Sequence, residues 1–359
     1  MNMKTNIKTA FLFCLALFSA CSSDNDEPGA EQQPTQQPAQ EKRYPLTIDV
    51  TENPMIADGD NGGTRAPIIT TSTLDKFYMS YVYGNSSSGG QRYTAVKTTE
   101  GKWITSDNNY TWPIDDDGNP IENVTWYAYT DGTFYYNNGS PYISFSDDEA
   151  AMHQKDLLVA KKVDNWNNCG GHLFFAFDHA CSALRFSVKK GANLSGYTLN
   201  ITDIKLCNVI KDGEYYLESN TWKLLTTKTN YTLYKSENGS SITPNENDYI
   251  VLNGTATTGD TDPYLFFIPQ TLTAWNETSA SGNAPSGGSY LQITCTITDD
   301  NNNNKQVFSG TAYYPFAATL QKGYQYNVNI NIGKKHLYKI ENGNTSNIIN
   351  NYEEEIYNP

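Results

Sequence analysis

The sequence predicts an all-β protein built as two β-sandwich domains in tandem. From Tyr44 onward, apolar and polar residues alternate with period two in one segment after another, which is typical of half-buried strands. Clusters of Gly, Asn, Asp and Ser separate these segments and predict hairpins or loops at 85–90, 115–119 and 299–304. About 300 residues follow the N-terminal region, which suits two domains, and no repeat of fixed length suggests a propeller or solenoid.

The first twenty residues predict a signal peptide. Lys4 and Lys8 form a basic start without an acidic residue, and an apolar run extends from Ala10 to Ala20. This run is shorter than the roughly 20 residues that a membrane-spanning helix needs. Residues 17–21, Leu-Phe-Ser-Ala-Cys, resemble a lipobox cut before the cysteine, so we expect a lipid on Cys21. The alternative is an ordinary secretory signal.

Residues 21–43 predict a disordered tether, because they are polar and rich in Gln and Pro. The several acyl chains of a lipidated cysteine suffice for stable membrane attachment. An acidic cluster directly after Cys21 resembles the signal that exports lipoproteins to the cell surface, although a plain spacer would have the same composition. We therefore expect a protein anchored by lipid to the outer membrane and exposed at the surface.

The N-terminal domain is expected at 44–185, and its first element is a short strand with Leu46, Ile48 and Val50 on one face. The Gly/Asp/Asn-rich stretch 58–63 follows, and then Arg65 and Ala66. A flexible loop of this kind can enter a protease cleft. If the strand occupies a sheet edge, its departure exposes unpaired backbone groups and an apolar groove, which a strand from another chain can fill.

The remaining strands are expected at intervals along both domains. A capping box at 146–149 predicts one short helical turn before Met152. The C-terminal domain is expected at 186–359, with the boundary somewhere between 165 and 195. The predicted strands are 77–83, 124–128, 155–162, 173–188, 198–209, 248–253, 264–268, 290–298, 306–314 and 324–332.

Charge and motifs argue against several functions. The formal net charge is −14, and loss of the signal peptide with its two lysines makes it −16. Such a surface repels nucleic acid and anionic lipid headgroups. The sequence has four histidines and lacks the nucleophile elbow, the phosphate-binding loop and the H-E-x-x-H motif. We therefore expect no catalysis and no cofactor. The alternative that two of the 39 acidic residues form a glycosidase pair stays open.

Metal binding is not expected either. The best grouping is Cys169, His172, His179 and Cys181, but the two histidines are an odd number of residues apart in an expected strand and point to opposite faces. Residues 115–119 resemble a calcium loop without its terminal glutamate and predict a solvated hairpin.

The cysteines of the folded part leave two alternatives open. Cys14 departs with the signal peptide, so four remain beside the lipidated Cys21. An exported protein permits disulfides, and burial as small apolar residues fits the spacing as well. The four are Cys169, Cys181, Cys207 and Cys295.

Six local segments, taken in order behind the lipoprotein signal, resemble the fimbrillin family, the pilins of protease-activated pili on certain Gram-negative outer membranes. The segments are Tyr110–Pro113, Val124–Tyr129, Asp156–Ala160, Phe177–Phe186, Phe267–Gln270 and Gly323–Tyr326. The resemblance implies two transthyretin-like β-sandwich domains and a lipidated precursor. It also implies that an arginine-specific protease removes the first strand and that a strand of the next subunit replaces it.

Transferred to this chain, the resemblance implies cleavage between Arg65 and Ala66 and displacement of the strand that carries Leu46, Ile48 and Val50. The leading hypothesis is a subunit of a surface fimbria that polymerises head to tail by donor-strand exchange and contributes to adhesion. Its expected partners are other pilin subunits, the protease, the outer membrane through the lipid, and a host or bacterial receptor. The alternative is a monomeric surface lipoprotein that binds glycans or host proteins through exposed aromatic residues.

Two questions stay open at this level. The subunit could occupy the stalk, the tip or the base of a fimbria. The tail after Gly333 could be a last strand, a donor strand or a disordered end.

Overall fold

The computed structural model describes residues 43–57, 74–84, 86–87, 92–107, 110–147, 156–237, 239–252, 264–334, 337–341 and 343–349. Within these ranges the regular structure is almost entirely β, which confirms the predicted all-β class. The helices found there are α1 (Trp166–Cys169) and the 3-10 turn η2 (Ala192–Leu194), and neither is long enough to cross a bilayer. The signal peptide, the tether, the 58–63 linker and most of the predicted 146–152 turn lie outside the described residues.

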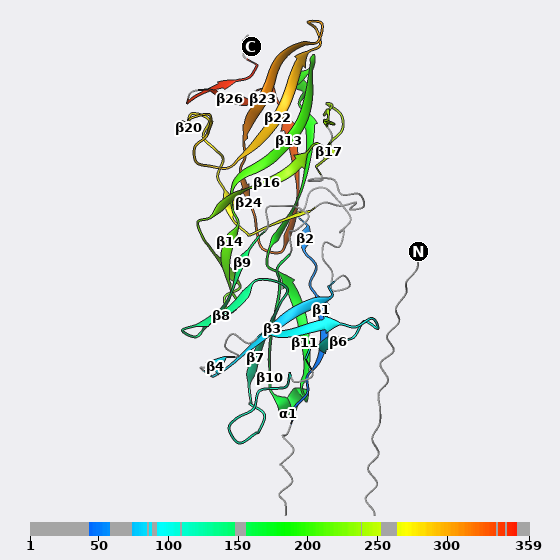
Figure 1. The fold of residues 1–359 in the computed structure, drawn as a ribbon, viewed down its shortest axis with the longest axis vertical. Coiled ribbons are helices and arrows are strands. Elements are labelled where there is room, and N and C mark those ends of the chain that lie inside the picture. The colour runs from blue at the N-terminus through cyan, green and yellow to red at the C-terminus, as the bar shows by residue number, and fades with distance from the viewer. Residues whose placement is uncertain are drawn as a thin grey trace, which may run out of the picture. The chain divides into compact units, whose positions relative to one another are not determined.

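The first sheet contains eight strands in the order β4-β3-β5-β6-β1-β11-β10-β7. Because β3 also pairs with β7, the sheet closes on itself (Figure 1). Its interior holds one apolar core with Phe77, Trp112, Trp126 and Phe175 among its fully buried side chains. The strands are β1 (Thr47–Glu52), β3 (Lys76–Tyr83), β4 (Ser86–Ser87), β5 (Tyr93–Lys97), β6 (Trp103–Thr105), β7 (Val124–Tyr129), β10 (Leu158–Asp164) and β11 (His172–His179).

Two further sheets enclose the largest core. A five-stranded sheet has the order β17-β12-β25-β2, with β18 also paired to β12, and a six-stranded sheet has the order β16-β13-β22-β23-β26-β27. Leu184 and Phe186 of the five-stranded sheet pack in this core with Ile204 and Ile293 of the six-stranded sheet. The strands are β2 (Ile56–Ala57), β12 (Ser182–Lys190), β13 (Tyr197–Ile210), β16 (Lys228–Lys235), β17 (Ile250–Val251), β18 (Leu265–Phe267), β22 (Tyr290–Asp299), β23 (Lys305–Pro315), β25 (Tyr324–Ile332), β26 (Tyr338–Glu341) and β27 (Asn344–Asn347).

A four-stranded sheet in the order β15-β14-β9-β8 contributes to a third core. Phe145 and Tyr215 of this sheet pack with Tyr129 of the first sheet and Cys181 next to β12. The strands are β8 (Thr133–Asn137), β9 (Ser140–Ser146), β14 (Asp212–Tyr216) and β15 (Thr221–Leu224), and two small pairs are β19 (Thr271–Leu272) with β24 (Ala318–Thr319) and β20 (Ala280–Ser281) with β21 (Ala284–Pro285).

The predicted strand 173–188 is two strands that belong to different sheets. The Ala180 N–H donates to the Leu157 carbonyl at 2.8 Å, and the Cys181 carbonyl accepts from the Gly323 N–H at 2.9 Å, so the ladder changes partners between β11 and β12. The proposed domain boundary, 165–195, includes this break, and the division into two tandem domains stays a prediction. The predicted loops at 115–119 and 299–304 are turns, the second joining β22 to β23.

Candidate functional site

The first described strand, β1, is a central strand of the closed sheet and lies between β6 and β11 (Figure 1). It pairs with β11 in parallel over its whole length, from Thr47 opposite His172 to Glu52 opposite Phe177. On the other side it meets β6 through one antiparallel pair, Ile48 with Trp103. The edge position considered from the sequence is therefore wrong. Removal of β1 would break the ring and leave β6 and β11 each with an unpaired side.

The side chains of β1 alternate between core and solvent as predicted. Ile48 is 4% exposed within the core of the first sheet, and Leu46 and Val50 are half-buried against the same core. Thr47, Asp49 and Thr51 point the other way and are exposed. The complete burial of one aliphatic side chain and the partial burial of two others are the main apolar contribution of this strand to stability.

Polar contacts add to the attachment of β1 at its exposed face. The Asp49 carboxylate lies 2.8 Å from His172 Nε2, and the Asn53 amide donates to the Asp178 carboxylate at 2.7 Å. Because these side chains are exposed, each contact stabilises the strand by no more than about 1 kcal/mol. The backbone ladder and the apolar burial therefore hold β1 more strongly than its charges do.

The chain continues from β1 into a second sheet. Met55 is 6% exposed and belongs to the third core, and β2 pairs in parallel with β25. The Ile56 N–H donates to the Gly323 carbonyl at 2.8 Å. Residues 44–57, called the N-terminal segment below, thus bridge two sheets. The burial of Met55 could not be predicted from the sequence, since no period-two pattern surrounds it.

The start of the N-terminal segment passes very close to Gly171. This glycine has φ +83°, and a Cβ there would lie 2.3 Å from the Pro45 carbonyl oxygen and 2.5 Å from the Trp166 ring. The Thr47 N–H donates to the Gly171 carbonyl at 3.0 Å. Nearby, the Tyr44 ring meets Trp166 edge to face at 4.9 Å. Only a residue without a side chain fits between the segment and α1.

A buried ion pair lies at the far end of β11. His179 Nδ1 bonds the Asp156 carboxylate, and both residues are at most 4% exposed. Burial lowers the pKa of His179, but Asp156, Glu52 and Asp178 raise it, and the net pKa lies above the ordinary value. Since Glu52 ends β1, the charge of His179 is linked to the end of this strand.

The predicted modification sites are not among these residues. Cys21, Arg65 and Ala66 lie outside the described residues, and the last described residue of the N-terminal segment, Ala57, precedes Arg65 by eight positions. Arg43 is described and exposed, directly before Tyr44.

The family model described as fimbrillin-like matches residues 64–349 of the chain. The chain belongs to the fimbrillin-like family. A fimbrial protein from Bacteroides vulgatus has a similar solved structure, with 18% identity, a TM-score of 0.50 and coverage of 86% of this chain and 100% of that one. A candidate cell adhesion protein from Bacteroides uniformis has 15% identity, a TM-score of 0.41 and coverage of 88% and 100%. No curated protein sequence matches.

The two histidines of the metal grouping considered above are separated in the structure. His172 is exposed and His179 is buried on the opposite face of β11, and the described ranges contain no cluster of three metal-ligating side chains. Asp115 accepts from the Asp117 and Asn119 N–H groups at 3.0 and 2.7 Å, which makes 115–119 a capped turn.

The four cysteines of the folded part are free thiols, which answers the disulfide question left open above. Cys181, Cys207 and Cys295 are buried, and Cys169 is half-buried. Burial raises the pKa of Cys207 and of Cys295 to about 12.

The tail of the chain after Gly333 contains two strands within its described part. β26 and β27 form a hairpin, and the completely buried Leu337 and Ile349, 8% exposed, join the largest core. β26 pairs with β23 only at Tyr313 and Tyr338. Continued in register, Thr311 would face Ile340, but an open cleft of about 500 Å³ separates the strands there.

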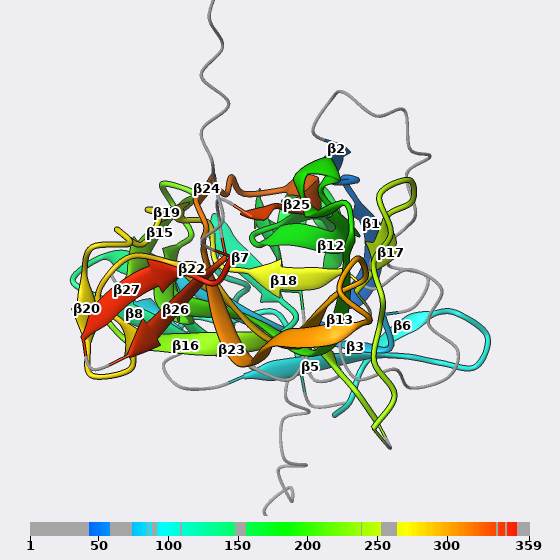
Figure 2. The same ribbon diagram turned by 90° about the horizontal axis from the view of Figure 1, so that it is seen from above.

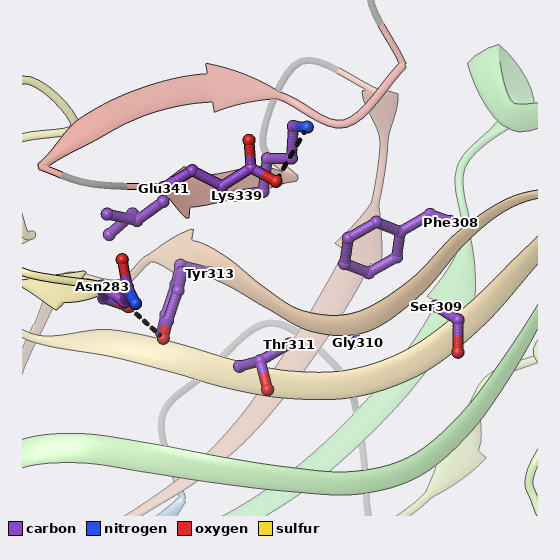
Figure 3. A pocket seen from close by; sticks show the side chains of 9 residues that line it. Asn283, Phe308, Ser309, Gly310, Thr311, Tyr313, Lys339 and Glu341 are labelled. Carbon is purple, nitrogen blue, oxygen red and sulfur yellow. Dashed lines mark hydrogen bonds and ion pairs between the residues drawn. The ribbon is translucent and has the colours of Figure 1, made fainter.

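Figure 3 shows this cleft with the Lys339–Glu341 ion pair on the hairpin side and Gly310 and Thr311 on the β23 side. The turn of this hairpin is hydrogen-bonded to the β20–β21 turn and not to β23, because the Gly343 N–H donates to the Gly282 carbonyl at 2.7 Å. The β26–β27 hairpin is thus joined to β23 by a single residue pair.

The aromatic residues expected for glycan stacking are mostly internal. All six tryptophans are buried or half-buried, so a platform of exposed tryptophans is ruled out. Trp126, Tyr129 and Phe177 are core residues, whereas Phe174 is 47% exposed because it lies on the outer face of β11. Tyr249 is another exposed aromatic residue, at 41%.

Proposed function

We propose that this fimbrillin is a structural subunit of a bacterial surface fimbria, exported as a lipoprotein precursor and polymerised by donor-strand exchange. The main observation is the position of β1, which is the first of the described strands and completes the ring between β6 and β11. Such a strand can leave without unthreading any of the other described strands. Its departure would uncover the core around Ile48 and the unpaired side of β11.

The groove left by the N-terminal segment would select a long partner. It would extend along β11 and reach β25, since β1 and β2 pair with these strands in parallel. An extended donor segment with apolar residues at alternate positions would restore the ladder and fill the places of Ile48 and Met55. Because donor and acceptor surfaces differ, repetition of this contact gives an open filament.

Maturation in this proposal needs a cut after the N-terminal segment. Cleavage between Arg65 and Ala66 would free residues 44–65 together with the lipid on Cys21. For a stalk or tip subunit, the lipid is then a temporary attachment to the outer membrane, whereas a base subunit would retain it. No catalytic activity is needed for these steps.

The test is digestion of purified precursor by an arginine-specific protease. We expect cleavage before Ala66, release of the segment and growth of polymers, seen by light scattering and electron microscopy. Arg65→Ala should block polymer growth. Arg43→Ala is the matched control and should polymerise normally, because a cut at Arg43 leaves β1 in place. A completely cut protein that loses the segment and stays monomeric would contradict the proposal and favour a monomeric binding lipoprotein.

A further inference from the structure

The strands β17, β12 and β25 run next to one another in the five-stranded sheet (Figure 2). A cleft with polar and apolar walls lies on their outer face. It has a volume of about 440 Å³. Leu184, Phe186 and Val188 of β12 face the core, so the residues between them face the cleft. The lining residues are Arg185, Ser187, Tyr249, Val251, Asn327 and Asn329. None of them belongs to the N-terminal segment.

The strand register places these side chains in adjacent rows. In the parallel pair of β12 and β25, Arg185 lies opposite Asn327 and Ser187 opposite Asn329. Val251 of β17 lies opposite Ser187 on the other side. Polar groups from two strands therefore meet on one surface, with an apolar wall along β17.

The cleft offers mainly hydrogen-bond donors. The Ser187 hydroxyl donates to Asn329 Oδ1 at 2.5 Å, which engages that oxygen and leaves the amide N–H groups for another acceptor. Asn327 and Asn329 are exposed. Arg185 already takes part in an interaction within the protein. Because a guanidinium has five N–H donors, it can bind a further acceptor at the same time.

The described lining residues are not acidic like the chain as a whole. They include one cation, Arg185, and no Asp or Glu, although the chain has a net charge of −14. Lys189 adds a second cation beside it, with Nζ 4.8 Å from the centre of the Tyr249 ring. Glu246, which precedes β17, is paired with Lys190 at 3.5 Å. An anionic group thus finds complementary charge at this cleft.

We propose that the cleft binds an acidic sugar unit of an extracellular polysaccharide. Its carboxylate would accept hydrogen bonds from Arg185, whose planar donors suit that group. The amides of Asn327 and Asn329 would bond the sugar hydroxyls, and the exposed Tyr249 ring would pack against the apolar face of the sugar. The site is independent of polymerisation, because the intact monomer already has it.

The test is calorimetric titration of the uncut monomer with two uronate oligosaccharides, a hyaluronan tetrasaccharide and a tetragalacturonate. We expect at least one to bind saturably and its carboxyl-reduced form to bind about tenfold more weakly or not at all. Arg185→Gln and Asn327→Ala should each weaken binding, Arg185→Gln by about tenfold or more, since it removes a charge-assisted hydrogen bond.

The matched controls are Lys305→Gln and Asn302→Ala, which alter exposed residues outside the cleft and should bind as the wild type does. Asn327 is exposed, so Asn327→Ala keeps the test decisive if Arg185→Gln unfolds. The proposal is overturned if neither uronate binds, if the reduced sugars bind equally well, or if sulfate at the same ionic strength competes as strongly as the sugar.

Discussion

The burial of β1 predicts that truncation of two isoleucines in the N-terminal segment has very different effects on how firmly the segment is held. Ile48 is 4% exposed in the core of the first sheet, whereas Ile56 is 51% exposed on β2. Truncation of a buried isoleucine to alanine costs about 2–5 kcal/mol, because apolar contacts are lost and a cavity stays behind. Truncation of an exposed one changes stability by about 0.5 kcal/mol or less. Ile48→Ala should therefore loosen the N-terminal segment and Ile56→Ala should not.

The measurement is hydrogen exchange of the backbone amides of residues 47–52 in the uncut monomer. If the segment opens locally, a cost of about 2–3 kcal/mol raises its exchange rate about 30- to 150-fold. The wild type and Ile56→Ala should exchange at similar rates. Local exchange is the right readout, since several sheets with separate cores need not unfold in one step.

Equal exchange in Ile48→Ala and Ile56→Ala would refute the idea that apolar burial holds β1 in place. The ladder to β11 would then be the main attachment, and a donor strand would need no matching apolar residue.

Three further changes have defined outcomes. Gly171→Ala places a Cβ against the Pro45 carbonyl at positive φ, so its melting temperature should fall well below that of Gly170→Ala, where a Cβ meets nothing within 4 Å. The pKa of His179 is raised in the folded state, so its protonated form stabilises the fold below pH about 6.5, and this stabilisation is lost as the pH rises through the folded pKa. The melting temperatures of the wild type and His179→Gln should therefore converge above the folded pKa. A gap that stays constant with pH would contradict the assignment. In protein lacking residues 1–21, four thiols should react with a disulfide reagent after unfolding, and fewer than four would reveal a disulfide. In the native state at pH 8, Cys207 and Cys295 should react at least about a hundredfold more slowly than after unfolding, because their pKa lies near 12.

Several strands could be predicted because their alternation is local. Each side chain of a strand faces opposite to its neighbours, so the pattern of Leu46, Ile48 and Val50 shows directly on the page. The same reasoning located β13, β22, β23 and β25 within a few residues.

Other strands were missed although a signal existed. Asn138 and Gly139 both have positive φ and join β8 to β9, and an Asn-Gly pair between alternating segments is a strong hairpin signal. β16 was also overlooked, because only Tyr231 and Leu233 of its side chains are buried. The four-stranded sheet was not anticipated, because none of its strands, β8, β9, β14 and β15, was predicted.

Taken alone, the sequence determined the all-β class, the alternating face of the first strand and a strongly acidic composition, and it raised the resemblance that the family match then confirmed. These properties depend on residue types and on spacing over a few positions. The tertiary structure decided that β1 is a central strand of a closed sheet, that Met55 and Gly171 help to position it, and that Arg185 lies opposite Asn327 at a cleft. Residues more than a hundred positions apart make these contacts, and their pairing depends on how whole sheets pack, which no local pattern encodes.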